Sequence, residues 1–189
     1  IGLGFAGRQF IRVQTRLALQ DWINDGQVQL STTMLGDADV SELGRRVLAF
    51  LAKYLGAQVG SLYVGNGNGN ASFVRVAGYG LESLDPRSEV VAAGQTLVGQ
   101  VAADGRVALI NDVPEGYIDV RTGTGAARPR TLCLLPTVAE GAVNGVVELG
   151  FFSDPPQAIF ELLKAVAPSL GMVIRSAHYR KLQAELLEE

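Results

Sequence analysis

GQTLVGQVAADGRVALINDVP, residues 94–114, is the stretch that decides the fold. An apolar helical face is formed by Leu97, Val98 and Val101. Thr96 stands where a helix N-cap is expected, and Gly105 stands where a helix commonly ends. Residues 107–110 then form an aliphatic run typical of a buried strand. A short helix followed by a strand can cover one face of a sheet, so we expect a ligand pocket between them.

The residues on both sides of this stretch predict paired strands. The expected strands are residues 58–64, 72–77, 89–92, 107–110, 131–138 and 143–152. GNGNGN, residues 65–70, has the composition of a hairpin loop, and residues 139–142 predict a second hairpin connection. Residues 115–130 lack a regular pattern and are expected to form an irregular connection. The chain therefore predicts a mainly antiparallel sheet of five or six strands.

Two helices are expected before the first strand. Residues 8–34 contain no proline and carry apolar side chains mostly three and four positions apart, which predicts a long amphipathic helix with a weak point at Gly26. Asp39 and Glu42 have the spacing of a capping box and predict the start of a second helix. Gly56 is expected to end that helix.

The last helix is expected to run from about Pro155 to the end of the chain. Its apolar seam consists of Ile159, Leu163, Val166, Leu170, Val173 and Ala177. The same register continues with Arg180, Ala184 and Leu187. Both terminal helices are longer than one small sheet requires, so we expect them to pack in a parallel homodimer. The alternative is a monomer whose long helices lie on the back of its own sheet.

The central stretch also carries a family resemblance. The pattern G-x-x-L-V-G-x-V/A-A-x-x-G-R, then a strand, then D-V-P, is carried by Gly94, Leu97, Val98, Gly99, Ala102, Gly105, Arg106, Asp112, Val113 and Pro114. It resembles a GAF domain over about residues 40–175. The likeness is closest to GAF domains of bacterial sensor histidine kinases, through residues 43–64, residues 128–152 and the helix from Pro155. It implies an α+β, GAF/PAS-like fold with helices on one face of the sheet and a pocket on the other.

The composition excludes several classes of protein. The chain has 189 residues and a net charge of −3, which disfavours binding to nucleic acid, as does the lack of a recognition motif. Its only cysteine rules out an internal disulfide and fits a reducing cytosol. No apolar run reaches the roughly 20 residues that span a bilayer. We expect a cytoplasmic location, with anchoring of the parent protein in the inner membrane left open. Because the chain begins at Ile1, we expect a fragment.

The sequence contains no cluster of residues suited to catalysis or to metal binding. His178, the only histidine, is expected to be a surface residue of the last helix, and a structural metal site is excluded with one histidine and one cysteine. No nucleophile–base pair or carboxylate pair can be placed, so an enzyme and a bound cofactor are not expected. Cys133 is expected to be a small buried hydrophobic residue, with a thiol lining the pocket as the alternative.

The resemblance places the ligand between the sheet and residues 94–135. Arg121, Arg128 and Arg130 flank a glycine-containing loop that can hold an acidic ligand or form a solvated surface. The candidate ligand-binding residues are Tyr63, Phe73, Leu97, Val98, Asp112, Tyr117, Arg121, Arg130 and Cys133. Because the strand parity is open, we expect some of them to point away from the pocket.

The resemblance implies a regulatory function. We expect residues 1–37 to form a signalling or linker helix, residues 38–175 the GAF domain, and residues 176–189 a coiled-coil-like extension. A small ligand or a partner would shift the pocket, and the last helix would pass the change to a downstream output domain of the same chain. We expect that output to be the histidine kinase of a bacterial two-component system. The alternative is a ligand-free structural module for dimerisation and spacing.

Overall fold

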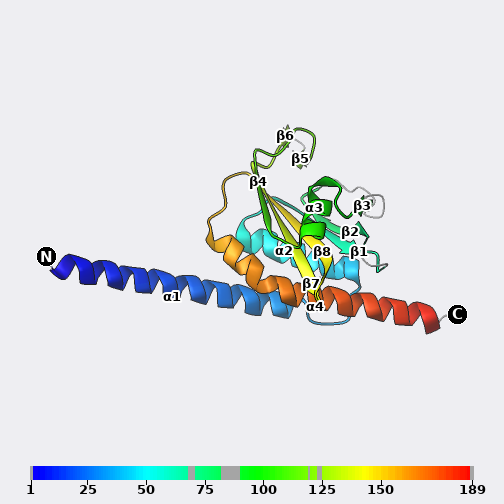
Figure 1. The fold of residues 1–189 in the computed structure, drawn as a ribbon, viewed down its shortest axis with the longest axis horizontal. Coiled ribbons are helices and arrows are strands. Elements are labelled where there is room, and N and C mark those ends of the chain that lie inside the picture. The colour runs from blue at the N-terminus through cyan, green and yellow to red at the C-terminus, as the bar shows by residue number, and fades with distance from the viewer. Residues whose placement is uncertain (1, 68–70, 82–89, 119, 123–124, 188–189) are drawn as a thin grey trace.

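The computed structural model describes residues 2–67, 71–81, 90–118, 120–122 and 125–187 (Figure 1). Its helices are α1 (Gly2–Thr33), α2 (Val40–Leu55), α3 (Thr96–Asp104) and α4 (Ala158–Leu187). Its strands are β1 (Val59–Gly65), β2 (Ser72–Tyr79), β3 (Val90–Ala92), β4 (Ala108–Asn111), β5 (Val120–Thr122), β6 (Gly125–Ala127), β7 (Thr131–Ala139) and β8 (Ala142–Phe151). The architecture is α+β, as the sequence predicts.

Six strands form one antiparallel sheet in the order β3-β2-β1-β8-β7-β4. The β1–β2 and β7–β8 hairpins are confirmed, and the latter turns through Glu140 and Gly141, a shorter connection than the sequence predicts. Both residues have positive φ, 52° and 79°, as a tight hairpin turn requires. Residues 115–130 are not wholly irregular, because β5 and β6 pair as a small separate hairpin within them. Residues 68–70 of the predicted loop and residue 89 lie outside the described residues.

The sheet is covered on both faces. On one face, α2 and α4 bury a large apolar cluster that includes Leu62, Val147 and Leu163. On the other face, α3 covers a smaller cluster that includes Phe73, Val98 and Leu132. The seven residues of β1 are therefore all buried, because alternate side chains enter the two clusters. Helices on one face and a roofed space on the other match the predicted layout.

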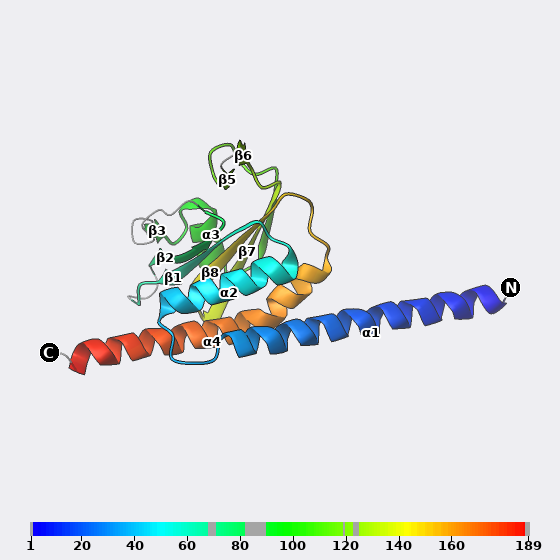
Figure 2. The same ribbon diagram turned by 180° about the vertical axis from the view of Figure 1, so that it is seen from behind.

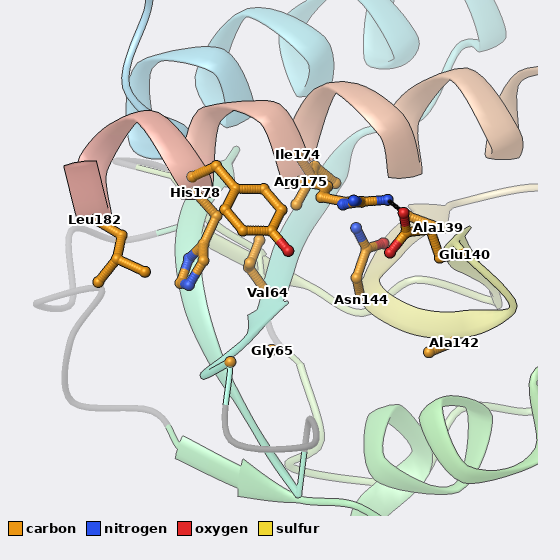
Figure 3. Close-up of a pocket in the computed structure, with 12 residues that line it drawn as sticks. Val64, Gly65, Ala139, Glu140, Ala142, Asn144, Ile174, Arg175, His178 and Leu182 are labelled. Carbon is orange, nitrogen blue, oxygen red and sulfur yellow. Dashed lines mark ion pairs between the residues drawn. The ribbon is translucent and has the colours of Figure 1, made fainter.

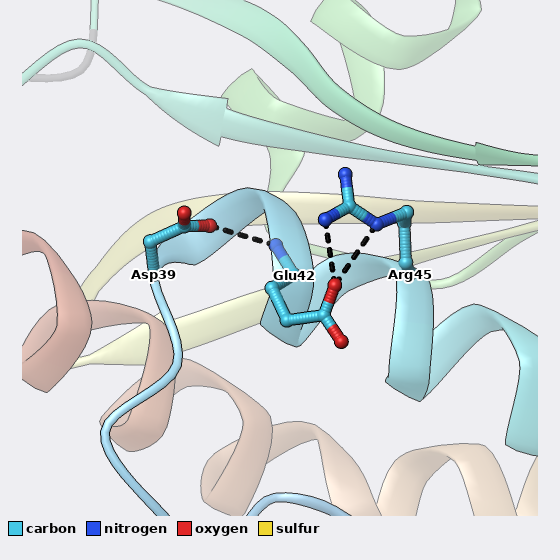
Figure 4. Close-up of polar contacts among 3 residues, drawn as sticks. All are labelled: Asp39, Glu42 and Arg45. Carbon is cyan, nitrogen blue, oxygen red and sulfur yellow. Dashed lines mark hydrogen bonds and ion pairs between the residues drawn. The ribbon is translucent and has the colours of Figure 1, made fainter.

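The start of α2 follows the predicted cap in part (Figure 4). The Asp39 carboxylate accepts a hydrogen bond from the Glu42 backbone N–H at 2.8 Å, which satisfies one open donor of the first turn. The Glu42 side chain is bound instead by Arg45, with Nη2 to Oε2 at 2.6 Å. The helix ends at Gly56, whose φ of 74° is left-handed, as predicted.

The terminal helices α1 and α4 lie side by side and leave the domain at opposite ends (Figures 1 and 2). The second half of α1 packs against α2 and α4 through Ile23, Leu30 and the following Met34. Gly26, the predicted weak point, is where a side chain would collide with Leu162 and Tyr54, each about 2.9 Å from an ideal Cβ. The glycine therefore permits a close approach between helices without interrupting α1.

The seam predicted on α4 is used within the chain itself. The seam side chains from Ile159 to Leu170, and Ala177, are buried in the helix-side cluster, and Val173 packs against that cluster. The helix begins at Ala158, after the two prolines, and contains Pro168. Its first part runs at an angle to the rest of the helix (Figure 1). Among the described residues, no helix is both long and apolar enough to cross a bilayer.

Candidate functional site

The roof of the site is α3, which is pinned closely to the sheet. Thr96, predicted as the cap, is the first residue of α3; it adopts a positive φ of 60°, and its hydroxyl accepts a long hydrogen bond of 3.4 Å from the Gly99 N–H. The N-cap position is held by Gln95, which makes no side-chain cap bond. An ideal Cβ at Gly99 would lie 2.2 Å from the carbonyl oxygen of Ala92, so only glycine fits there. The Gly99 carbonyl in turn accepts a hydrogen bond of 2.7 Å from the Gly94 N–H. These contacts fix the start of α3 over the end of β3.

A small hollow of about 150 Å³ lies between α3 and β4. Its apolar walls are formed mainly by Leu97, Val101, Ala108, Ile110 and Leu134. Asp104 and Arg106 also line it. Ligand sites usually enclose about 300–1,000 Å³, so this hollow by itself is smaller than a usual ligand site.

Buried polar side chains lie on the same face of the sheet. Ser61 and Tyr63, two positions apart on β1, share one face of that strand. Ser61 pairs across the ladder with Glu148 of β8, and Tyr63 pairs with Arg75 of β2. Glu148 is 2% exposed and Arg75 is 7% exposed. A carboxylate and a guanidinium are thus set into the apolar face beneath the roof.

Tyr117 connects this polar group to the loop beside the roof. Its hydroxyl donates a hydrogen bond of 3.0 Å to Oε1 of Glu148. Tyr117 and the neighbouring Ile118 also pack against the apolar cluster under α3. A buried carboxylate is expensive to desolvate unless it is hydrogen-bonded, so this contact holds the loop to the sheet.

The structure brings together part of the predicted ligand site. The predicted residues that lie in or against the cluster under α3 are Tyr63, Phe73, Leu97, Val98 and Tyr117. Asp112 is exposed in a turn with a φ of 58°. Arg130 lies outside the cluster, where its Nε is 3.5 Å from the Asp154 carboxylate. The side chain of Arg121 is outside the described part of the structure.

Cys133 lies on the opposite face from the roof. It is buried among the side chains that pack under α2 and α4. Burial raises the pKa of its thiol to about 12. The predicted alternative of a pocket thiol therefore does not fit its position, and the buried small hydrophobic residue does.

Ser61, Arg75 and Glu148 were missed by sequence reasoning. The signal was present, because Arg75 interrupts the apolar strand FVRVA and Glu148 interrupts VVEL. A charged residue inside a strand that is buried on both faces needs a polar partner.

The comparisons agree with this fold. A family model described as GAF domain matches residues 37–175, so the chain belongs to the GAF domain family. No curated protein matches the chain.

Solved structures of GAF domains are similar over most of the chain. The GAF domain of an Acinetobacter phosphoenolpyruvate-protein phosphotransferase is 17% identical, with a TM-score of 0.69, covering 84% of this chain and 96% of that one. Residues 122 to 287 of a methyl-accepting chemotaxis protein are 20% identical, with a TM-score of 0.61, covering 82% and 99%. Free methionine-R-sulfoxide reductase from Neisseria meningitidis, solved with its substrate, is 13% identical, with a TM-score of 0.62, covering 86% and 91%. At these identities the likeness shows the fold alone.

Proposed function

We propose that this chain is the regulatory GAF domain of a bacterial signal-transduction protein of the sensor histidine kinase type. It binds a small polar ligand beneath α3 and relays the event along α4 to an output domain. The observation that carries the proposal is the buried Glu148 carboxylate, held by Tyr117 of the loop beside the roof. A ligand with hydrogen-bond donors would compete for this carboxylate and thereby move Tyr117 and its loop.

The relay step is supported by a polar contact between the sheet and α4. The Asn144 side chain donates a hydrogen bond of 2.8 Å to the carbonyl oxygen of Gly171 and accepts one of 3.0 Å from the Thr137 hydroxyl. Val143, the preceding residue, packs against the cluster under α3. Neighbouring residues of β8 thus contact the roofed side and the output helix, so a shift of one can bias the other.

We propose a parallel homodimer through the terminal helices. The seam that packs within the chain leaves a different apolar stripe of α4 exposed, which includes Met172, Tyr179 and Leu186 at intervals of seven residues. On α1, Leu17 and Val28 are exposed as well. Apolar stripes on neighbouring helices are commonly buried by a second copy.

Native mass spectrometry of the chain, with a denatured control, tests ligand and dimer together. We expect a dimer that carries an additional mass, lost in Glu148→Gln and retained in the matched surface variant Glu115→Gln. A clean monomer would overturn the dimeric relay. An additional mass that persists in Glu148→Gln would overturn the assignment of Glu148.

A ligand-free spacer is the second candidate function. The size of the hollow between α3 and β4, about 150 Å³, favours it, because a filled pocket suits a domain that only dimerises and transmits. A dimer without additional mass that also fails to take up any compound from a library of polar metabolites would establish this reading in place of ligand sensing.

A further inference from the structure

A second, larger hollow lies on the other side of the sheet, beside α4 (Figure 3). It is an open hollow bordered by α4, by the end of β1 with the first residues of its loop, and by the β7–β8 turn. Its volume is about 340 Å³. That volume falls within the range of sites for small molecules. Its apolar wall is formed by Val64, Ile174 and Leu182.

A guanidinium stands at one end of this hollow. Arg175 forms an ion pair with Glu140 of the β7–β8 turn (Figure 3), and its guanidinium lies 5.2 Å from the centre of the Tyr179 ring. The ring and the ion pair hold the guanidinium in place. The Glu140 side chain is 67% exposed. The carboxylate of a ligand can therefore take its place beside Arg175, and the displaced Glu140 carboxylate stays in solvent.

An imidazole stands at the other end. His178 is half-buried, and its Nε2 lies 3.1 Å from the position that a Cβ at Gly67 would take, so the ring lies directly against the β1–β2 loop. His178 forms no hydrogen bond or ion pair with the residues that the structure describes. It is a partly exposed residue of α4, as expected, and it also lines this hollow.

The surroundings favour a negative charge. An adjoining hollow of about 820 Å³ shares Val64 and His178 with the first, and Arg45 and Lys181 line it. Its acidic residue, Asp39, is engaged as the cap of α2. Arg45 is paired with Glu42, so Lys181 is the side chain that adds positive charge beside His178 and attracts an anion to this end of the domain.

We propose that the hollow beside α4 is a second ligand site, specific for a small organic anion. The carboxylate or phosphate of the ligand pairs with Arg175, and its apolar or aromatic body packs against Val64, Ile174 and Leu182 towards His178 at the other end. The site is separate from the one under α3 and lies directly on the output helix. Its occupant would brace α4 against the sheet just beyond Gly171.

Titrations of the ¹⁵N-labelled chain test the proposal, with benzoate and phenyl phosphate as probes and benzamide as the uncharged match for benzoate. We expect either anion to bind with a dissociation constant of about 1 mM or tighter. The largest shifts should fall on Gly65, Gly67, Ala139 and residues 174–182. Benzamide, which lacks the charge, should bind about tenfold more weakly.

Variants locate the site. Arg175→Gln should weaken benzoate binding by about tenfold, while Arg128→Gln, at a surface arginine paired with Glu115, should leave it unchanged. A spectrum of each variant without ligand serves as the control for folding. Equal binding of benzamide, shifts centred on Val98 and Tyr117, or no shift at about 10 mM anion would each overturn the proposal. None of these results would by itself remove the site under α3.

Discussion

Replacing Asn144 by alanine should loosen α4 from the sheet. The Asn144 amide is the partner of two buried groups, the Thr137 hydroxyl and the Gly171 carbonyl oxygen, at 3.0 and 2.8 Å. An ideal Cβ at Gly171 would lie 2.2 Å from the Val138 carbonyl oxygen, so helix and strand are in backbone contact here and leave little room for water. Both groups would therefore stay buried in the variant without their present partner.

The magnitude follows from these two losses. A buried group left without its partner costs about 1–3 kcal/mol, so Asn144→Ala should lower the free energy of unfolding by about 3 kcal/mol. For a chain of this length, that loss corresponds to a fall in Tm of about 6–12 °C. Thr137→Val removes only the hydroxyl at similar volume and should cost about 1 kcal/mol.

Urea unfolding of the wild type, both single variants and the double variant measures the effect. The double variant should be more stable than the sum of the single losses predicts, by about 1 kcal/mol, since both changes remove the same hydrogen bond. Hydrogen exchange should quicken in α4 beyond Gly171 more than in α2. A loss below about 0.5 kcal/mol for Asn144→Ala, or additive effects of the two changes, would refute the coupling of sheet and helix through this side chain.

Three further predictions concern the roofed side and the core. Gly99→Ala should destabilise the chain by about 1–3 kcal/mol in urea unfolding, since its Cβ would collide with the Ala92 carbonyl; Gln100→Ala, on the exposed side of α3, should change little, and equal effects would contradict the close approach. Tyr117→Phe should cost about 1.5–3 kcal/mol through the lost bond to Glu148, and an unchanged midpoint would show that this bond is not stabilising. Burial raises the pKa of the Cys133 thiol to about 12, so this thiol should react with iodoacetamide at pH 8 only after unfolding, and rapid labelling of the folded chain would contradict its burial. The free energy of unfolding should also fall as the pH rises from about 9 towards 12, because the unfolded chain then gives up a proton that the folded chain retains.

Local signals in the sequence were sufficient for most of the fold. Asp39 and Gly56 bound α2 because a cap and a left-handed glycine act on the nearest turn. The hairpins followed from alternation and turn composition. The small β5–β6 hairpin was missed because its strands are three residues each, too short to display a period.

The partner of an apolar stripe could not be predicted in the same way. The spacing of Ile159, Leu163 and Val166 suits a coiled coil, and it equally suits a helix packed on its own sheet. The structure uses these residues in the second way, and the exposed stripe at Met172, Tyr179 and Leu186 lies on another side of α4.

The sequence also did not show which face of its strand each candidate site residue occupies. Neighbouring residues of β7, such as Leu132 and Cys133, are both fully buried but enter different clusters, so burial shows no alternation that would set the parity. A shift of one residue exchanges the two faces. Cys133 was therefore placed among the pocket candidates, while Glu148, on the face beneath the roof, was left out.

Pro168 gives α4 a point at which the helix can bend, and this point lies inside the domain. Proline lacks the N–H that would bond to the carbonyl four residues earlier, so the helix bends more easily there than elsewhere. From that point to Leu187 the helix extends about 28 Å. A change of about 10° in the bend would move its far end sideways by about 5 Å. A small change in the bend near the sheet would thus become a sideways movement of about 5 Å at the far end of α4.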